Sequence, residues 1–166
     1  MNIYKLAILF LLVFQASPAF ADVVWPAMFL EMKMLIWWVI AFGLIIEYVF
    51  LRIFFKMRIL EGIKICIVMN FISTLLGIIL IPLSGIAWEI VPGMIIYPIF
   101  NMGTFNPLTW SATFILAVLV NLKVESWTII KIFKRKMQKS EYFFLALANA
   151  FSVGIAYYCL FIDNHF

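Results

Sequence analysis

Residues 63–81, IKICIVMNFISTLLGIILI, contain a single charged side chain, Lys64, and are otherwise mostly apolar. A stretch of about 20 predominantly apolar residues is long enough to cross the hydrocarbon core of a bilayer as one helix. Three further stretches have the same character: residues 27–54, 108–130 and 142–162. The sequence therefore predicts an all-α integral membrane protein, built as a bundle of four transmembrane helices.

The overall composition agrees with this prediction. Of 166 residues, 67% are hydrophobic and 12% are charged, and the mean hydropathy is +1.14. An ordinary soluble domain has about 25% charged residues and about half apolar ones, so a soluble fold is excluded. Residues 22–166 have room for four spans and short connections, and we expect them to form one domain.

The amino terminus has the pattern of a secretory signal peptide. Lys5 precedes the apolar run of residues 6–14, and Ala19-Phe20-Ala21 follows it with small residues at the positions that a signal peptidase requires. The run is too short to span a bilayer. We therefore expect residues 1–21 to be cleaved, with an uncleaved short anchor as the alternative, and the mature terminus to face the periplasm or the exterior.

Prolines and polar residues punctuate the predicted spans. Pro26 and Pro107 stand where a first helical turn tolerates proline, and Asn106 is a suitable N-cap. Pro82 is predicted to end the second span. Residues 84–106 are aromatic but interrupted by proline and glycine, so we expect short interfacial helices or a partly re-entrant cap on the outer surface.

The basic residues predict the orientation. Nine of the twelve lie in the connections between the first and second spans and between the third and fourth, or, as Arg52 and Lys64 do, at the facing ends of the first two spans. By the positive-inside rule these two loops are cytoplasmic, which puts both mature termini outside, as the signal peptide also requires. We expect a bacterial inner membrane and no nucleic-acid partner. The residues expected to meet lipid headgroups are Arg52, Lys56, Arg58, Lys131, Lys134, Arg135 and Lys136.

Two pairs of polar residues indicate an internal repeat. Glu47 and Glu125 are 78 residues apart, and Asn70 and Asn149 are 79 residues apart. A tandem repeat of two helical hairpins would relate them by a pseudo-two-fold axis along the membrane normal. The alternative is a chance match, because apolar spans align easily with one another. If the repeat is real, these four residues form an intramembrane polar belt at one depth.

Intramembrane acids are costly to insert, so Glu47 and Glu125 are expected to face the inside of the bundle. Helical spacing places Glu31 nearly opposite Glu47, which predicts that Glu31 is exposed at the outer interface. Small and polar residues recur at helical spacing and predict a packing seam between helices. The seam residues are Gly62, Cys66, Ser73, Gly77, Asn121 and Ser152.

The belt has two interpretations. In the first, the belt only holds the helices together, through hydrogen bonds of neutral carboxyls to amides and hydroxyls. In the second, it is a proton or cation site with an oxygen-rich shell. There is no nucleophile with a plausible base, no phosphate-binding loop and no ligand set with zinc spacing, so we expect no catalysis, no cofactor and no metal. An intramembrane enzyme would need a reactive group beside these carboxylates, and the sequence offers none.

The function expected first is therefore that of a non-catalytic accessory, assembly or interaction subunit of a membrane complex. Its partners would be the lipid bilayer and either another membrane protein or a second copy of this chain. The alternative is a small proton- or cation-coupled transporter that uses the belt.

Overall fold

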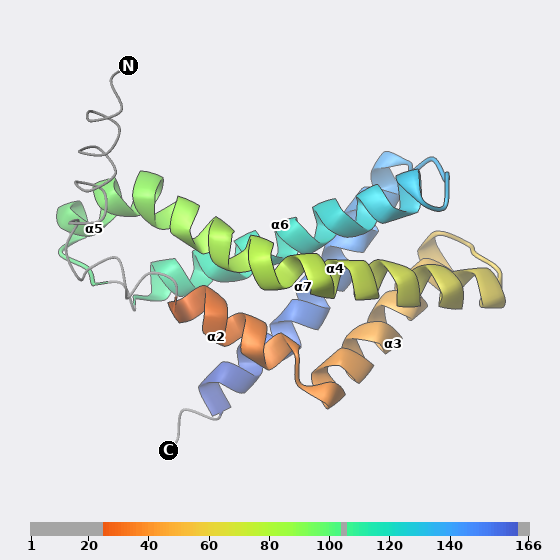
Figure 1. Cartoon of the computed structure of the whole chain (residues 1–166), viewed down its shortest axis with the longest axis horizontal. Coiled ribbons are helices and arrows are strands. Elements are labelled where there is room, and N and C mark those ends of the chain that lie inside the picture. Colours follow the sequence, from red (N-terminus) through yellow and green to blue (C-terminus); the bar gives the residue numbers. More distant parts are fainter. Residues whose placement is uncertain (1–24, 104–105, 163–166) are drawn as a thin grey trace, which may run out of the picture.

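The computed structural model of the chain describes residues 25–103 and 106–162, and every regular element in these ranges is helical (Figure 1). The predicted signal peptide, residues 1–21, lies outside the described residues. The elements are α2 (Trp25–Met34), α3 (Trp37–Phe54), α4 (Ile59–Trp88), the π-helical turn η2 (Glu89–Gly93), α5 (Met94–Phe100), α6 (Pro107–Lys131) and α7 (Lys139–Ile162).

Four helical segments of the described chain are long and apolar enough to cross a membrane, which confirms this part of the fold prediction. They are Trp37–Phe54, Ile59–Phe100, Pro107–Lys131 and Lys139–Leu160. The third and fourth agree closely with the predicted spans. As predicted, Asn106 caps α6: its side-chain oxygen accepts a hydrogen bond from the backbone N–H of Thr109 at 2.9 Å.

The first predicted span, residues 27–54, is not one helix. It is broken at Leu35 and Ile36, where Ile36 is extended and its N–H bonds to the carbonyl of Lys33 at 3.2 Å. The short helix α2 therefore leaves the axis of α3 (Figure 1). This break changes which side of the bundle the side chains of α2 face.

The second predicted span, residues 63–81, begins later and ends earlier than the helix in the structure. Helix α4 begins at Ile59 and continues through Pro82 to Trp88, and η2 and α5 extend the helical path to Phe100. The prediction that Pro82 ends the helix is wrong. Proline is tolerated inside membrane helices, where neighbouring groups can re-satisfy the carbonyl that its missing N–H leaves free.

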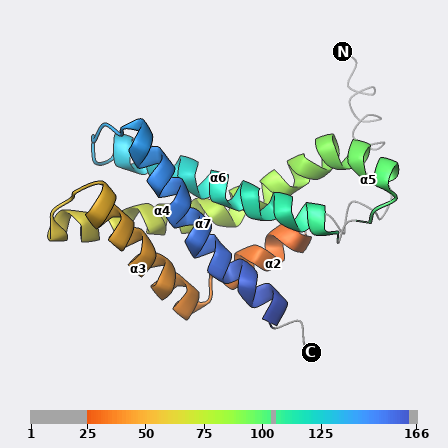
Figure 2. The same ribbon diagram turned by 180° about the vertical axis from the view of Figure 1, so that it is seen from behind.

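The long helices form two hairpins that interlock. The first hairpin is α3–α4 and the second is α6–α7. The most extensive packing is between hairpins, of α4 against α6 and of α3 against α7, while α2 packs against α4 and α7. Figures 1 and 2 show α4 and α6 running along the long axis, with α3 and α7 crossing them. Each hairpin therefore buries its faces mainly against the other.

Two apolar clusters lie at different levels of the bundle. One contains Leu51, Met69, Ile129 and Leu145, near the two loops that carry the basic residues. The other lies toward the opposite end and contains residues of α2 and of all four long helices, among them Leu30, Val39, Ile81, Ala117 and Val153. The residues between these clusters along the four helices include the glutamates and asparagines of the predicted belt.

Candidate functional site

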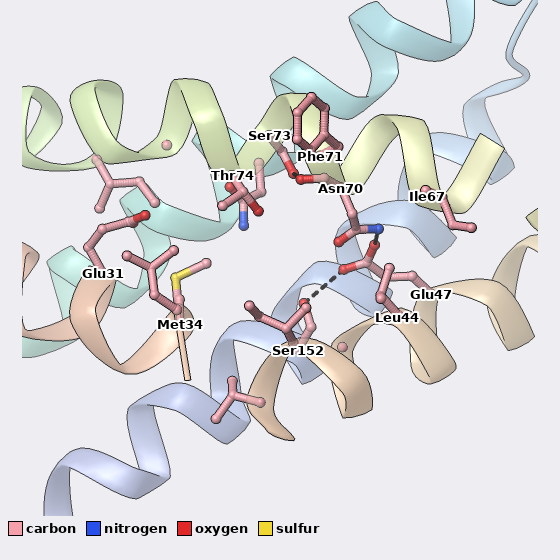
Figure 3. Close-up of a pocket in the computed structure, with 17 residues that line it drawn as sticks. Glu31, Met34, Leu44, Glu47, Ile67, Asn70, Phe71, Ser73, Thr74 and Ser152 are labelled. Carbon is pink, nitrogen blue, oxygen red and sulfur yellow. Dashed lines mark hydrogen bonds between the residues drawn. The ribbon is translucent and has the colours of Figure 1, made fainter. Parts of the chain in front are cut away.

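Glu47 links the two hairpins. Its side chain is only 2% exposed. One carboxyl oxygen accepts a hydrogen bond from the side-chain amide of Asn70 on α4 at 2.5 Å, and the other accepts one from the hydroxyl of Ser152 on α7 at 3.0 Å (Figure 3). Through Glu47, helix α3 is therefore bonded both to α4, its partner in the first hairpin, and to α7 of the second hairpin.

Glu125 makes the same bonds from the other hairpin. It is 1% exposed, accepts from the amide of Asn149 on α7 at 2.6 Å, and accepts from the hydroxyl of Ser73 on α4 at 3.3 Å. The structure therefore brings all four residues of the predicted belt into the bundle interior. Each glutamate has one asparagine partner within its own hairpin and one serine partner in the other.

Many buried positions of the two hairpins correspond at the same spacing of 78 or 79 residues. The correspondence extends to the two basic loops, where Lys56 and Lys134 have left-handed φ angles of 51° and 53°. The two hairpins therefore have the same glutamate–asparagine bonds and the same conformation at one turn residue. Corresponding buried residues are Gly43 and Asn121, Leu51 and Ile129, Cys66 and Leu145, Gly77 and Ala156, and Ile81 and Leu160.

The predicted seam residues also lie inside the bundle. Gly62, Cys66, Ser73, Gly77 and Asn121 are buried, and Ser152 is half-buried. A Cβ at Gly62 would stand 3.4 Å from the ring of Tyr48, and a Cβ at Gly77 would stand 3.6 Å from a carboxyl oxygen of Glu31; both are ordinary van der Waals contacts.

Glu31 is buried, contrary to the sequence prediction. It is 6% exposed, and its Oε2 is a buried oxygen without a hydrogen-bond partner in the described part of the chain. The prediction assumed one straight helix through residues 27–54. Because the chain breaks at Leu35 and Ile36, α2 turns the carboxyl of Glu31 toward Gly77 of α4 instead of toward the outer interface.

Glu31 and Glu47 lie at opposite ends of one cavity of about 310 Å³ (Figure 3). Its polar lining includes Asn70, Ser73, Thr74 and Ser152. The remaining walls are mostly apolar, with Met34, Val39, Leu44, Ile67, Phe71 and Ile81 among them. Glu125 is not part of this lining. The two equivalent glutamates therefore differ in one respect, because only Glu47 faces an open space.

The basic residues predicted to meet headgroups lie together at one end of the bundle. Six of the seven are exposed, and Arg135 is half-buried. The guanidinium of Arg135 donates to the carboxyl of Glu141 and to the backbone carbonyl of Phe55, each at 2.9 Å. Arg135 therefore joins the two basic loops to each other.

A second polar cluster lies beyond α4, where the sequence predicted only an outer segment. Tyr97 of α5 donates to the buried carboxyl of Glu89 at 2.8 Å, and its hydroxyl also bonds to the hydroxyl of Thr109 at 2.5 Å. The indole N–H of Trp88 donates to the same Tyr97 oxygen at 3.2 Å. These bonds attach η2 and α5 to the start of α6.

The polar core has the groups for reversible binding of a proton or a cation. Carboxyl oxygens supply charge, while amide and hydroxyl groups supply directional hydrogen bonds. Among the described residues there is no group of three or more His, Cys, Asp or Glu side chains that could hold a metal ion. No protein-family model, curated protein or solved structure matches this chain.

Proposed function

We propose that this protein is a small multi-pass membrane protein that binds a proton or a cation in its polar core, as a proton- or cation-coupled transporter does. The observation that carries the proposal is the cavity that reaches Glu47 and Asn70, with a second buried acid, Glu31, at its other end. A carboxyl within the membrane that adjoins an open space can exchange its proton or counter-ion, whereas a fully packed one cannot.

The interlocked arrangement also supports this function. Glu47 and Glu125 each bond across the interface between the hairpins, so a change of charge at either residue alters the contact between them. A change of charge at Glu47, the one of the two that adjoins the cavity, is a local electrostatic event that biases how the two hairpins pack against each other. Alternating access in repeat-built transporters uses a comparable movement of one repeat against the other.

A second candidate is an accessory or assembly subunit without transport activity. The observation that favours it is that all four carboxyl oxygens of Glu47 and Glu125 already accept hydrogen bonds from neutral donors. Bonds of this kind between membrane helices contribute about 0.6 kcal/mol each and fix the packing. In this case the belt stabilises the fold, and the function lies in contacts with a membrane partner or a second copy.

For either function we propose insertion into a bacterial inner membrane with both mature termini outside. Support comes from the contact between the two basic loops at one end of the bundle, since the positive-inside rule assigns basic loops to the cytoplasm. Labelling of single cysteines introduced at Lys56 and Lys134 in sealed vesicles tests this orientation. Both positions should react only from the cytoplasmic side, and labelling from the outer side would contradict the proposal.

The test of function is the thermal stability of the purified protein in detergent across pH and added Na⁺ or K⁺. A ligand that binds the folded state raises its stability with concentration by mass action. We expect such a rise in the wild type and its loss in the double variant Glu47→Gln, Glu125→Gln. The control is Glu61→Gln, which removes a carboxyl that is 48% exposed and far from the belt.

Equal responses of the wild type and the double variant would reject ion binding at the belt. They would favour the accessory-subunit candidate, in which these glutamates serve only to pack helices. If the response is confined to the wild type, reconstitution into liposomes and measurement of ion flux along an imposed gradient is the next step.

A further inference from the structure

The cavity between Glu31 and Glu47 is much larger than a proton or a bare metal ion requires. Its volume of about 310 Å³ falls in the range of small-molecule sites, which begins at about 300 Å³. An inorganic ion bound at one carboxyl would leave the apolar part of this space unfilled. The size and the lining therefore point to a ligand that has carbon atoms as well as a charge.

The charge of the ligand follows from Glu31. This carboxyl is 6% exposed, lies at one end of the cavity, and has a buried oxygen without a hydrogen-bond partner among residues 25–103 and 106–162. An unpaired buried acid is costly unless a cation or a donor meets it. The Glu47 carboxyl at the other end is already bonded to Asn70 and Ser152. Of the two carboxyls that line the cavity, only that of Glu31 therefore has an oxygen without a hydrogen-bond partner in the described part of the chain.

The shape of the cavity suggests how such a ligand lies. Glu31 adjoins Gly77 and Glu47 adjoins Asn70, and these two residues of α4 are about 10 Å apart along the helix at 1.5 Å per residue. Apolar side chains line the space between the acids. On the rim, Ile67 and Phe71 are 56% and 64% exposed, so the cavity adjoins the face of the bundle that lipid would cover.

We propose that this cavity binds a primary alkylammonium ion, with the ammonium group donating to Glu31 and the alkyl chain lying against the apolar wall toward Glu47. The inference rests on the proposed function, for which it names the class of cation. An amphipathic cation can enter from the bilayer between α3 and α4, where Phe71 lies on the rim. Its ammonium group donates to the Glu31 carboxyl that lines the cavity, and its chain fills the apolar volume.

The experiment is titration calorimetry of the protein in lipid nanodiscs with hexylammonium, after subtraction of the heat from empty nanodiscs. The neutral probe 1-hexanol has the same chain without the charge. We expect saturable binding of hexylammonium, at least tenfold weaker binding to Glu31→Gln, and unchanged binding to the control Glu61→Gln. Binding of 1-hexanol should be at least tenfold weaker than that of hexylammonium in the wild type.

A second variant tests the cavity while it keeps both acids. A Cβ at Gly77 would make ordinary contacts with Ile81 and Glu31, so Gly77→Ala is sterically tolerated, whereas the branched side chain of Gly77→Val extends into the space beside Glu31. We expect Gly77→Val to weaken hexylammonium binding at least tenfold and Gly77→Ala to weaken it less. Size-exclusion profiles equal to that of the wild type establish that each variant is folded.

Three results would overturn the inference: no saturable binding to the wild type, equal binding to Glu31→Gln, or equal affinity for 1-hexanol. The proposed function fails by a different result, namely an unchanged response to pH and Na⁺ in the Glu47→Gln, Glu125→Gln variant. That variant retains Glu31, so the two failures can be told apart.

Discussion

Glu47 and Glu125 each accept a hydrogen bond from the asparagine of their own hairpin and from the serine of the other hairpin. This reciprocity means that neither hairpin completes its polar core alone. In a lipid environment, where apolar burial gives little drive for helix association, such bonds and close packing hold helices together. The two glutamates are therefore the points at which the fold and the candidate site depend on each other.

The serine bonds between hairpins should contribute to stability. Ser73→Ala and Ser152→Ala each remove one hydroxyl that donates to a buried carboxyl and shares its proton with a carbonyl of its own helix, and we expect each to lower the free energy of unfolding by about 0.6–1.5 kcal/mol. Ser111→Ala is the control, because Ser111 is exposed and bonds only to the carbonyl of Pro107 in its own helix. Denaturant unfolding in mixed micelles measures all three, and an effect of Ser111→Ala as large as the others would contradict the prediction.

The two asparagines should differ despite their equivalent positions. Asn149 is 0% exposed and its partner Glu125 does not line the cavity, whereas Asn70 is half-buried and lines it. Loss of the amide in Asn149→Leu strands a carboxyl oxygen where water cannot replace the donor, at a cost of about 1–3 kcal/mol. In Asn70→Leu the cavity admits a water molecule, so the loss should be smaller. Equal losses of unfolding free energy would show that the open space has no such effect.

The spans and the belt could be predicted because both depend on local chemistry. A long apolar segment has to satisfy its backbone bonds as a helix, and an acid such as Glu47 or Glu125 in that segment has to face protein. The exact partners could not be predicted. Which serine meets which glutamate depends on how α3 crosses α7 and α4 crosses α6, and that geometry is set by packing of the whole bundle.

The break between α2 and α3 had no signal in the sequence. Residues 27–42 contain neither proline nor glycine, so the sequence predicts one continuous helix through Leu35 and Ile36, and this helix would place Glu31 on the wrong side of the bundle. The opposite error occurred at Pro82, where a residue that usually ends helices lies inside α4. Tertiary contacts override local propensity in both places. One available signal for Glu31 was its acidity within an apolar segment, which by itself favours an interior position.

The close contact between α2 and α4 should control the position of Glu31. A Cβ at Gly85 would lie 3.0 Å from the Cβ of Ala27, which is closer than side chains normally approach. We expect Gly85→Val to push α2 away and to lower the free energy of unfolding by about 1–3 kcal/mol. Gly103→Val is the control, since a Cβ there has no described atom within 4 Å. A shift in thermal midpoint for Gly103→Val as large as that for Gly85→Val would contradict the steric argument.

The matching loops give a test of the correspondence between the hairpins that does not involve the glutamates. Lys56 and Lys134 both have positive φ, a conformation that costs an L-amino acid about 1–2 kcal/mol and costs glycine nothing. Glycine loses more conformational entropy on folding than lysine does, and this loss offsets part of the gain. We therefore expect Lys56→Gly and Lys134→Gly each to raise the free energy of unfolding by a net of about 0.5 kcal/mol. Lys139→Gly removes the same charge at the first residue of α7, where glycine disfavours the helix, and should not stabilise.

Opposite effects at Lys56 and Lys134 in denaturant unfolding would mean that the two turns are not equivalent. Equal gains, with no gain at Lys139, would support a common turn in the two hairpins, because removal of charge alone would then fail to explain the stabilisation.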